Sequence, residues 1–215
     1  MSLKPQVINA KTLQMIMGTI ACSLPFVLVI TVYILGDNTP YQPSISDFFF
    51  TKAKVPFIGS LWAVGMFMFA YKGYLDNKRI SDNAISNVLG FCAIAIAVFP
   101  TDPENADLST IGILHLVFAG TFFIILGYMS YFRFTLSNQA LGSLKAPKIR
   151  RNFVYKLCGI LLFLSLLCMV IYLILESLEV IPVFKHVIFW CETAGLLAFG
   201  VSWLTKAELI FPDLD

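Results

Sequence analysis

The sequence predicts an all-α integral membrane protein, a bundle of six transmembrane helices with both termini in the cytoplasm. Three observations support this fold class. The 215 residues are 58% hydrophobic and 13% charged, whereas a soluble domain needs about a quarter of charged residues. Six apolar stretches follow one another, most of them close to the ~20 residues that cross a ~30 Å hydrocarbon core. The basic residues gather in alternate segments between these stretches.

The first three helices are expected at about residues 15–36, 55–72 and 84–99. The first stretch is too long for the core of a signal peptide, and no small-residue cleavage site follows it, so we expect a retained helix. The second ends at Tyr71 and Lys72, residue types that favour the headgroup region. The third has 16 residues. It would rise only about 24 Å, so it needs its flanking turns or a thinned bilayer to cross.

The last three helices are expected at about 111–131, 153–175 and 184–204, and all six in one domain over residues 1–215. Pro100 and Pro103 separate the third helix from the fourth by a rigid turn, because proline stops a helix. A segment rich in Gly, Ser, Pro and basic residues, 141–151, is the expected linker before the fifth helix. Lys206 follows the sixth.

Small residues predict two packing faces. In the sixth helix Ala194, Ala198 and Ser202 recur every four residues, and Gly59 and Ala63 do the same in the second. Small side chains let helix backbones approach closely in lipid, where van der Waals packing replaces the hydrophobic effect. We therefore expect both faces to contact other helices of the chain.

The distribution of positive charge predicts the orientation. Twelve of the fifteen Lys and Arg residues fall in the segments that lie on one side of such a bundle, together with both termini. Positively charged loops are retained in the cytoplasm, so that side is expected to be cytoplasmic. The opposite side carries Lys52, Lys54 and Lys185.

Composition also excludes several classes of protein. The net charge of +2 is small and forms no patch for nucleic acid, and the mean hydropathy of +0.81 is too high for a soluble domain. All five cysteines lie in apolar stretches without a C-x-x-C pair, which excludes a disulfide framework or a thiol relay as the organising feature.

A polar cluster is expected on the non-cytoplasmic side, where most of the ionisable residues that lipid disfavours gather. Three consecutive phenylalanines, 48–50, hold the first outer loop near the membrane. Glu192 is the deepest charge, about eight residues or roughly 12 Å into the sixth helix, where it needs a partner or water. The cluster consists of Ser44, Ser46, Asp47, Asp102, His115, His186 and Glu192.

One interpretation of the cluster is a metal site. His115, His186 and Asp102 would bind a divalent metal such as zinc, because imidazole nitrogens and carboxylate oxygens suit such ions. Glu192 or Asp47 would then be the catalytic base that accepts a proton from the metal-bound water. Haem bound by the two histidines fits less well, since a single pair of histidines near the solvent-exposed ends of the helices gives little support for a haem site.

Two further interpretations need no metal. In the first, the polar groups form a hydrogen-bonded lid that locks the outer helix ends, with the carboxylates paired to lysines of the same side. In the second they form a binding vestibule, in which Ser44, Ser46 and Lys52 contact the ligand. Proton-coupled transport through Glu192 fits less well, because no ionisable relay continues into the inner half of the helices.

Several short motifs resemble a family of bacterial membrane proteins. They are Ser44-Ile-Ser-Asp47, Phe99-Pro-Thr-Asp-Pro103, His115, and the stretch from Phe189-Trp-Cys-Glu192 to Gly200-Val-Ser-Trp-Leu-Thr-Lys206. They are similar to the family catalogued as domain of unknown function 998. The resemblance spans most of the chain. It implies a six-helix bundle and suits a bacterial inner membrane, but it implies no activity.

A looser resemblance is to alkaline ceramidases and adiponectin receptors, membrane hydrolases in which Ser, Asp and three His build a zinc site. This chain has two histidines and no H-x-x-x-H motif in a late helix. The departure counts against ordinary zinc amidase chemistry, although Asp47, Asp102 or Glu192 would in principle replace a ligand.

The sequence thus predicts an outer-face site for a lipid-like or amphipathic ligand, with metal-assisted hydrolysis as one activity. The alternatives are non-enzymatic binding or transport of a small molecule or lipid, and a structural subunit of a membrane assembly. Membrane lipids are the expected partners and nucleic acid is not. The sequence decides neither between enzyme and binding protein nor the oligomeric state.

Overall fold

The computed structural model describes residues 9–36, 41–73, 81–103, 106–137, 146–180 and 184–213. These residues form helices and contain no strand, which confirms the all-α prediction. A 3-10 helix, η1, precedes α2, and a π-helical turn, η2, continues α4. The elements are α1 (Ala10–Ile34), η1 (Ser46–Phe50), α2 (Lys54–Ala70), α3 (Asp82–Val98), α4 (Thr110–Tyr128), η2 (Met129–Arg133), α5 (Ala146–Ser177) and α6 (Val187–Lys206).

Four of these helical segments are long and apolar enough to cross a membrane. They are α1, the continuous segment Thr110–Arg133, α5 and α6. The other two, α2 and α3, are apolar but have 17 residues each, which corresponds to a rise of about 25 Å. The chain is therefore a multi-pass membrane protein whose second and third helices are both short.

The largest difference from the expected boundaries is at the start of α5. This helix begins at Ala146 instead of 153, so the expected linker 141–151 is helical from Ala146 onwards, while 141–145 lie outside the described residues. Lys and Arg are good helix formers, and Arg151 is buried against the C-terminal segment through hydrogen bonds to Phe211 and Asp213. A tertiary contact thus extends the helix beyond its apolar stretch.

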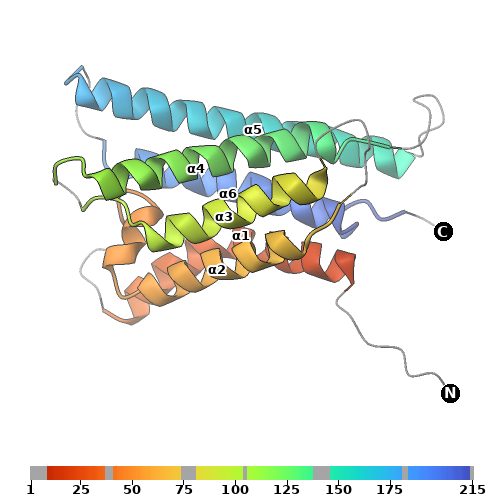
Figure 1. Cartoon of the computed structure of the whole chain (residues 1–215), viewed down its shortest axis with the longest axis horizontal. Helices are drawn as coiled ribbons and strands as arrows, with labels where there is room; N and C mark the ends of the chain where they lie inside the picture. The colour runs from red at the N-terminus through yellow and green to blue at the C-terminus, as the bar shows by residue number, and fades with distance from the viewer. Residues whose placement is uncertain are drawn as a thin grey trace.

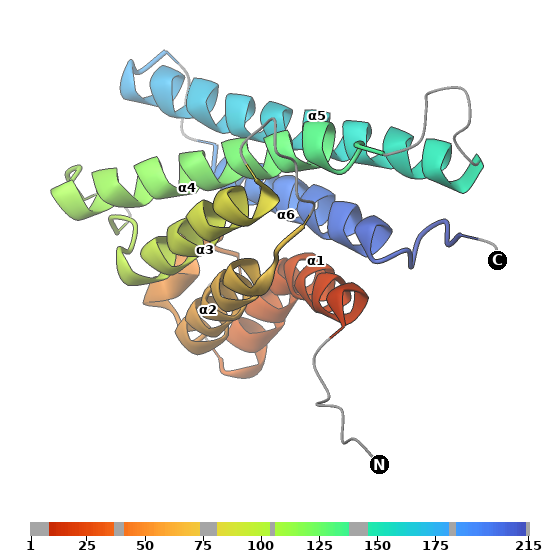
Figure 2. The same ribbon diagram turned by 45° about the vertical axis from the view of Figure 1, so that its right-hand side comes forward.

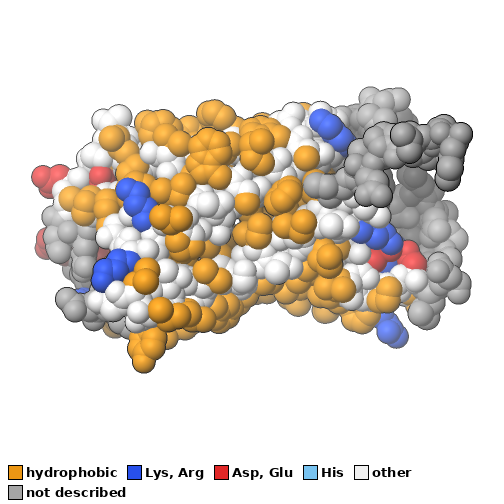
Figure 3. All heavy atoms as spheres, turned by 90° about the horizontal axis from the view of Figure 1, so that it is seen from below, with side chains coloured by type: hydrophobic (Ala, Val, Ile, Leu, Met, Phe, Trp, Pro, Cys, Tyr) orange, Lys and Arg blue, Asp and Glu red, His pale blue; other side chains and the backbone are white. Residues whose placement is uncertain are grey.

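The helices form a bundle in which the start of α1 and the end of α6 lie at the same end (Figure 1). α6 packs between α1 and α5, α2 packs on α3, and α4 lies between α3 and α5. The view in Figure 2 shows the same order. On the face in Figure 3, hydrophobic side chains cover the middle and charged side chains lie towards the two ends, as expected for a lipid-facing surface.

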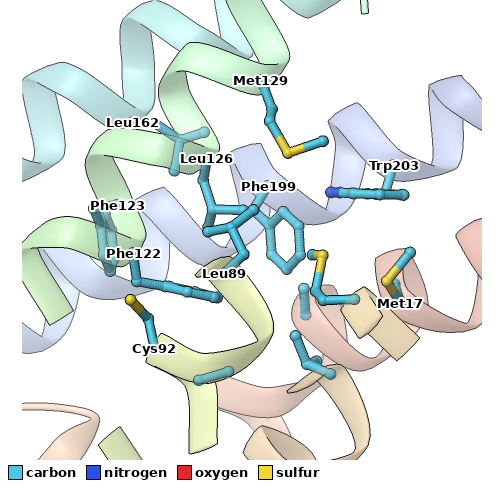
Figure 4. Packing of buried hydrophobic residues seen from close by; sticks show 14 of the residues in the cluster. Met17, Leu89, Cys92, Phe122, Phe123, Leu126, Met129, Leu162, Phe199 and Trp203 are labelled. Atoms are coloured by element: carbon cyan, nitrogen blue, oxygen red, sulfur yellow. The ribbon is translucent and has the colours of Figure 1, made fainter. Parts of the chain in front are cut away.

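A close-packed apolar core fills the middle of the bundle. Figure 4 shows Leu89 of α3, Phe122 and Leu126 of α4, and Phe199 and Trp203 of α6 in this cluster. The rings of Phe122 and Phe199 lie edge to face with centroids 6.3 Å apart. These side chains are almost completely buried, so α3, α4 and α6 are held together at mid-height.

Glycines permit the closest helix contacts. A Cβ added to Gly200 of α6 would lie 2.8 Å from the carbonyl oxygen of Gly18 in α1, and one added to Gly90 of α3 would lie 2.8 Å from that of Gly65 in α2. One added to Gly159 of α5 would lie 2.7 Å from Cβ of Tyr131, which follows α4. Only glycine allows backbones to approach this closely.

The expected packing faces were partly wrong. In α6, Ala198 and Ser202 are buried as expected, but Ala194 is exposed. In α2, Gly59 has no atom within 4 Å of its Cβ position, whereas Gly65 contacts α3. The four-residue spacing alone does not show which side of a helix meets a neighbour.

A buried ion pair lies at the end of the bundle near the start of α1. Arg133 Nε donates to Asp82 Oδ1 over 2.5 Å, and the two side chains are 0% and 1% exposed. The charge pattern of the sequence predicts basic residues at this end but does not predict a buried ion pair there. The pair joins the start of α3 to the end of the α4 segment, which the sequence places 51 residues apart.

Substitution of Gly200 by Ala is expected to destabilise the bundle. The new methyl group would press on the Gly18 backbone, and overpacking costs about 1–3 kcal/mol, more than the helix propensity that alanine gains. Gly59→Ala is the matched control, because its Cβ enters open space. Thermal unfolding in detergent should show a lower midpoint for Gly200→Ala only. Equal midpoints for both variants would contradict the contact.

Asp82→Asn is expected to lower the free energy of unfolding by about 3–5 kcal/mol, since it removes one charge of a buried pair. The double variant Asp82→Asn/Arg133→Met should lose much less than the sum of the two single variants. Chemical denaturation of all three tests this coupling, and strict additivity would rule it out.

Candidate functional site

A cavity of about 490 Å³ opens at the end of the bundle opposite the start of α1 and the end of α6. It lies among α4, α5 and α6, with the segment 43–47 at its polar end. Seven of the eight residues that the sequence predicts as site residues line it: Ser44, Ser46, Asp47, Asp102, His115, His186 and Glu192. The eighth, Lys52, is not among the lining residues and donates from Nζ to the carbonyl of Leu35.

The cavity exists because α4 and α5 separate towards this end. They are in close contact at the other end, where Gly159 lies against Gly127 and Tyr131. In both Figure 1 and Figure 2 the two ribbons diverge from that contact. The backbones of α4 and α6 come close to each other at few positions, so the three helices leave a wedge-shaped space between their outer halves.

The inner part of the cavity is an apolar shaft. The lining residues of α4 run from His115 to Phe123, a rise of about 12 Å along the helix. Gly120 adds free space, since no atom lies within 4 Å of its Cβ position. Phe123 forms the floor, with its ring directly against Gly195 of α6. The remaining apolar lining comes from Leu116 and Ala119 of α4, Leu166, Met169, Val170, Leu173 and Ile174 of α5, and Val187 and Ile188 of α6.

Backbone and side-chain hydrogen bonds attach the segment 43–47 to α6. Phe189 N donates to Pro43 O over 2.9 Å, and Ile45 N donates to Glu192 Oε2 over 2.5 Å. Within the segment, Ser44 donates from both N and Oγ to Asp47 Oδ2. Glu192 thus has a partner in the backbone N–H of Ile45.

A serine and a histidine meet at the junction of the polar end and the shaft. Ser46 Oγ lies 2.9 Å from His115 Nε2, and His115 Nδ1 lies 2.7 Å from Phe99 O. Because a carbonyl oxygen only accepts, Nδ1 carries a proton. In the neutral ring, Nε2 therefore accepts the Ser46 hydroxyl proton. Both side chains are buried, 8% and 3% exposed, although they line the cavity.

Asp102 supports the start of α4. Its carboxylate accepts from Ser109 N over 3.0 Å and from Ser109 Oγ over 2.5 Å, while Ser109 Oγ accepts from Gly112 N and so caps the helix. These hydrogen bonds from Ser109 hold the pKa of Asp102 below its ordinary value. A carboxylate at a helix N-terminus is also favoured by the helix dipole.

The model of a family described as "Protein of unknown function (DUF998)" matches residues 19–202. The chain belongs to this family. No curated protein and no solved structure matches the chain. The family match covers α2, α3, α4 and α5 in full, together with the polar end of the cavity.

The metal ligands predicted for this DUF998 member have other partners. His115 uses both ring nitrogens, His186 Nδ1 lies 2.9 Å from Gln42 O, and Asp102 accepts from Ser109. Within the described ranges, no three His, Cys, Asp or Glu side chains are grouped in a way that would hold a metal ion. The metal site therefore stays a prediction. The described part of the chain contains no group of side chains that would bind the metal.

The sequence did not predict that α5 of this family member forms one wall of the cavity. Tyr172 is buried and its hydroxyl contacts both N and O of Phe184, at 3.1 Å each, and this contact holds the segment before α6 against α5. Glu176 and Lys185 also line the cavity. The available signal was a tyrosine, followed four residues later by a glutamate, at the outer end of an otherwise apolar helix.

The contribution of Asp102 to the stability of the fold is expected to depend on pH. Its native pKa is lowered, so the ionised carboxylate stabilises the fold fully above its unfolded-state pKa of about 4, and this stabilisation is lost as the pH falls through the native pKa. Asp102→Asn should therefore flatten the decline in melting temperature at acid pH. Asp107→Asn, an exposed position of the same loop, should retain the decline. Identical profiles for both variants would argue against the prediction.

Proposed function

We propose that this protein binds a lipid-like or amphipathic molecule in the cavity among α4, α5 and α6, from the non-cytoplasmic side of the membrane. The observation that carries the proposal is the division of one cavity into two parts. Hydroxyls, carboxylates, a lysine and two histidines surround one end, and aliphatic and aromatic side chains line the rest. An amphiphile has the same division.

The size and the charges of the cavity agree with such a ligand. A volume of about 490 Å³ lies within the range of about 300–1,000 Å³ that small-molecule sites occupy. The polar end combines the cation of Lys185 with the carboxylates of Asp47, Asp102, Glu176 and Glu192. Charges of both signs favour a neutral polar or zwitterionic headgroup, with Ser44 and Ser46 as hydrogen-bonding contacts.

The diverging walls also support lateral access from the lipid. Leu116 of α4 and Val170 and Leu173 of α5 line the cavity and are 39–45% exposed. An apolar chain would slide between these helices without crossing water. The polar headgroup would then meet the end near the segment 43–47, at the depth of the membrane interface.

The orientation is part of the proposal. The basic residues Lys11, Arg133, Arg151 and Lys206 lie at the end of the bundle away from the cavity. The positive-inside rule therefore supports six membrane spans with cytoplasmic termini and an outward-facing cavity. In a bacterium, as the family resemblance implies, this membrane would be the inner one.

Binding is favoured over conduction because the shaft is closed beneath Phe123. Its ring lies against Gly195, and the buried core with Phe122, Leu126 and Phe199 follows directly (Figure 4). A path across the bundle would have to open this core. A site that accepts and releases its ligand at one end needs no such change.

Gly120→Leu is expected to fill the shaft and weaken ligand binding at least tenfold. The probe is lysophosphatidylcholine with a pyrene at the end of its acyl chain, a zwitterionic single-chain amphiphile, titrated against the full-length protein in nanodiscs. Gly59→Leu is the matched control, since the glycine it replaces also faces open space but does not line the cavity. Equal affinities of the two variants would refute the proposed site.

A further inference from the structure

We propose that Ser46 is a nucleophile and His115 its general base, so that the cavity hydrolyses carboxylic esters of amphiphiles. This inference rests on the proposed binding function, since it requires an amphiphile in the shaft. It assigns the reaction to a serine and a histidine that lie 69 residues apart in the sequence, and it uses no metal.

The geometry is that of an activated hydroxyl. A serine hydroxyl is a weak nucleophile unless a base within about 2.6–3.2 Å accepts its proton, and the base in turn needs a third group to orient it. Ser46 Oγ and His115 Nε2 are 2.9 Å apart, and the Phe99 carbonyl lies 2.7 Å from Nδ1. The carbonyl fixes the tautomer in which Nε2 is free to accept, the role that a carboxylate has in the best-known serine hydrolases.

Several contacts hold the nucleophile in place. Ser46 is the first residue of η1. Two residues later, Phe48 is 0% exposed and packs beside Phe189 of α6. On the other side, Ile45 N donates to Glu192 Oε2. Glu192 is therefore a positioning residue, because it fixes the backbone directly before the nucleophile. A site held by packing and hydrogen bonds loses little by reorganisation during a reaction.

The position of the pair selects the substrate. Ser46 and His115 lie where the hydroxyls and carboxylates of the polar end meet Leu116 and Ala119 of the shaft. In an ester-linked amphiphile, the ester group lies at the same junction between headgroup and chain. With the acyl chain in the shaft, the carbonyl carbon would come to Ser46 Oγ and the alcohol part would remain at the polar end.

The reaction balances with water as the second substrate. Ser46 Oγ forms a bond to the carbonyl carbon while His115 Nε2 accepts the hydroxyl proton. The bond from that carbon to the ester oxygen then breaks, and the departing alcohol takes the proton from Nε2. Water attacks the acyl-serine with His115 again as base, which releases the carboxylic acid and restores the hydroxyl of Ser46.

A covalent probe separates this catalytic role from a purely structural role of the pair in locking η1 to α4. A fluorophosphonate with a long alkyl chain is added to the full-length protein in nanodiscs, and the modified residue is identified by peptide mass spectrometry. We expect modification of wild-type Ser46. Modification elsewhere, or none, would overturn the proposal without any variant being needed.

Three variants then test the roles of the residues. Ser46→Ala should abolish labelling, and His115→Ala should slow it about 100-fold or more, the range expected for loss of a general base. Ser177→Ala, an exposed serine at the outer end of α5 that does not line the cavity, should label like the wild type. Undiminished labelling of Ser46 in folded His115→Ala would overturn the role of the base.

Binding of the pyrene lysolipid is measured on the same samples. Retained binding without labelling of Ser46 would refute the reaction alone and leave the binding function standing. Loss of both lysolipid binding and labelling of Ser46 would refute the binding function as well. Hydrolysis of the lysolipid ester to free fatty acid and glycerophosphocholine by wild type, but not by Ser46→Ala, is the direct positive result.

Discussion

Close packing of helix backbones in lipid is the constraint on which the rest of the structure depends. Lipid tails are as apolar as leucine, so the hydrophobic effect does not drive helices together, and short backbone distances must supply the attraction. Glycine pairs provide them between α1 and α6, between α2 and α3, and between α4 and α5. In the last pair the contact of Gly159 with Tyr131 holds the helices together at one end only. The divergence of the other ends creates the cavity.

The two ends of the bundle use polar groups differently. At the closed end Asp82 and Arg133 form a buried pair, and Arg151 joins α5 to the C-terminal segment. Loss of one partner of the Asp82–Arg133 pair would leave an unpaired charge in a low dielectric. The pair therefore resists separation and keeps this end of the bundle rigid. At the open end the carboxylates of Asp102 and Glu192 accept hydrogen bonds from backbone N–H groups of Ser109 and Ile45. These bonds fix loops and leave the hydroxyl and imidazole of the site facing the cavity.

The polar lid and the binding vestibule, which the sequence offered as alternatives, are compatible in this structure. The hydrogen bonds of Asp47, Asp102 and Glu192 lock the outer helix ends as a lid would. The same segments surround the polar end of an apolar shaft. A rigid rim is useful to a binding site, because preorganised groups lose little freedom when a ligand arrives. The lid therefore supports the site instead of replacing it.

The sequence by itself determined the helices, the membrane and the clustering of polar residues near one end, because hydropathy and charge act over whole segments. It did not determine which side chains meet. The contact of Ser46 with His115, the floor formed by Phe123 on Gly195, and the pairing of Asp82 with Arg133 each depend on the rotation and crossing of helices far apart in the chain. An apolar residue facing lipid and one facing a shaft have the same hydropathy. Only tertiary packing separates them, since it is set by backbone contacts at particular glycines.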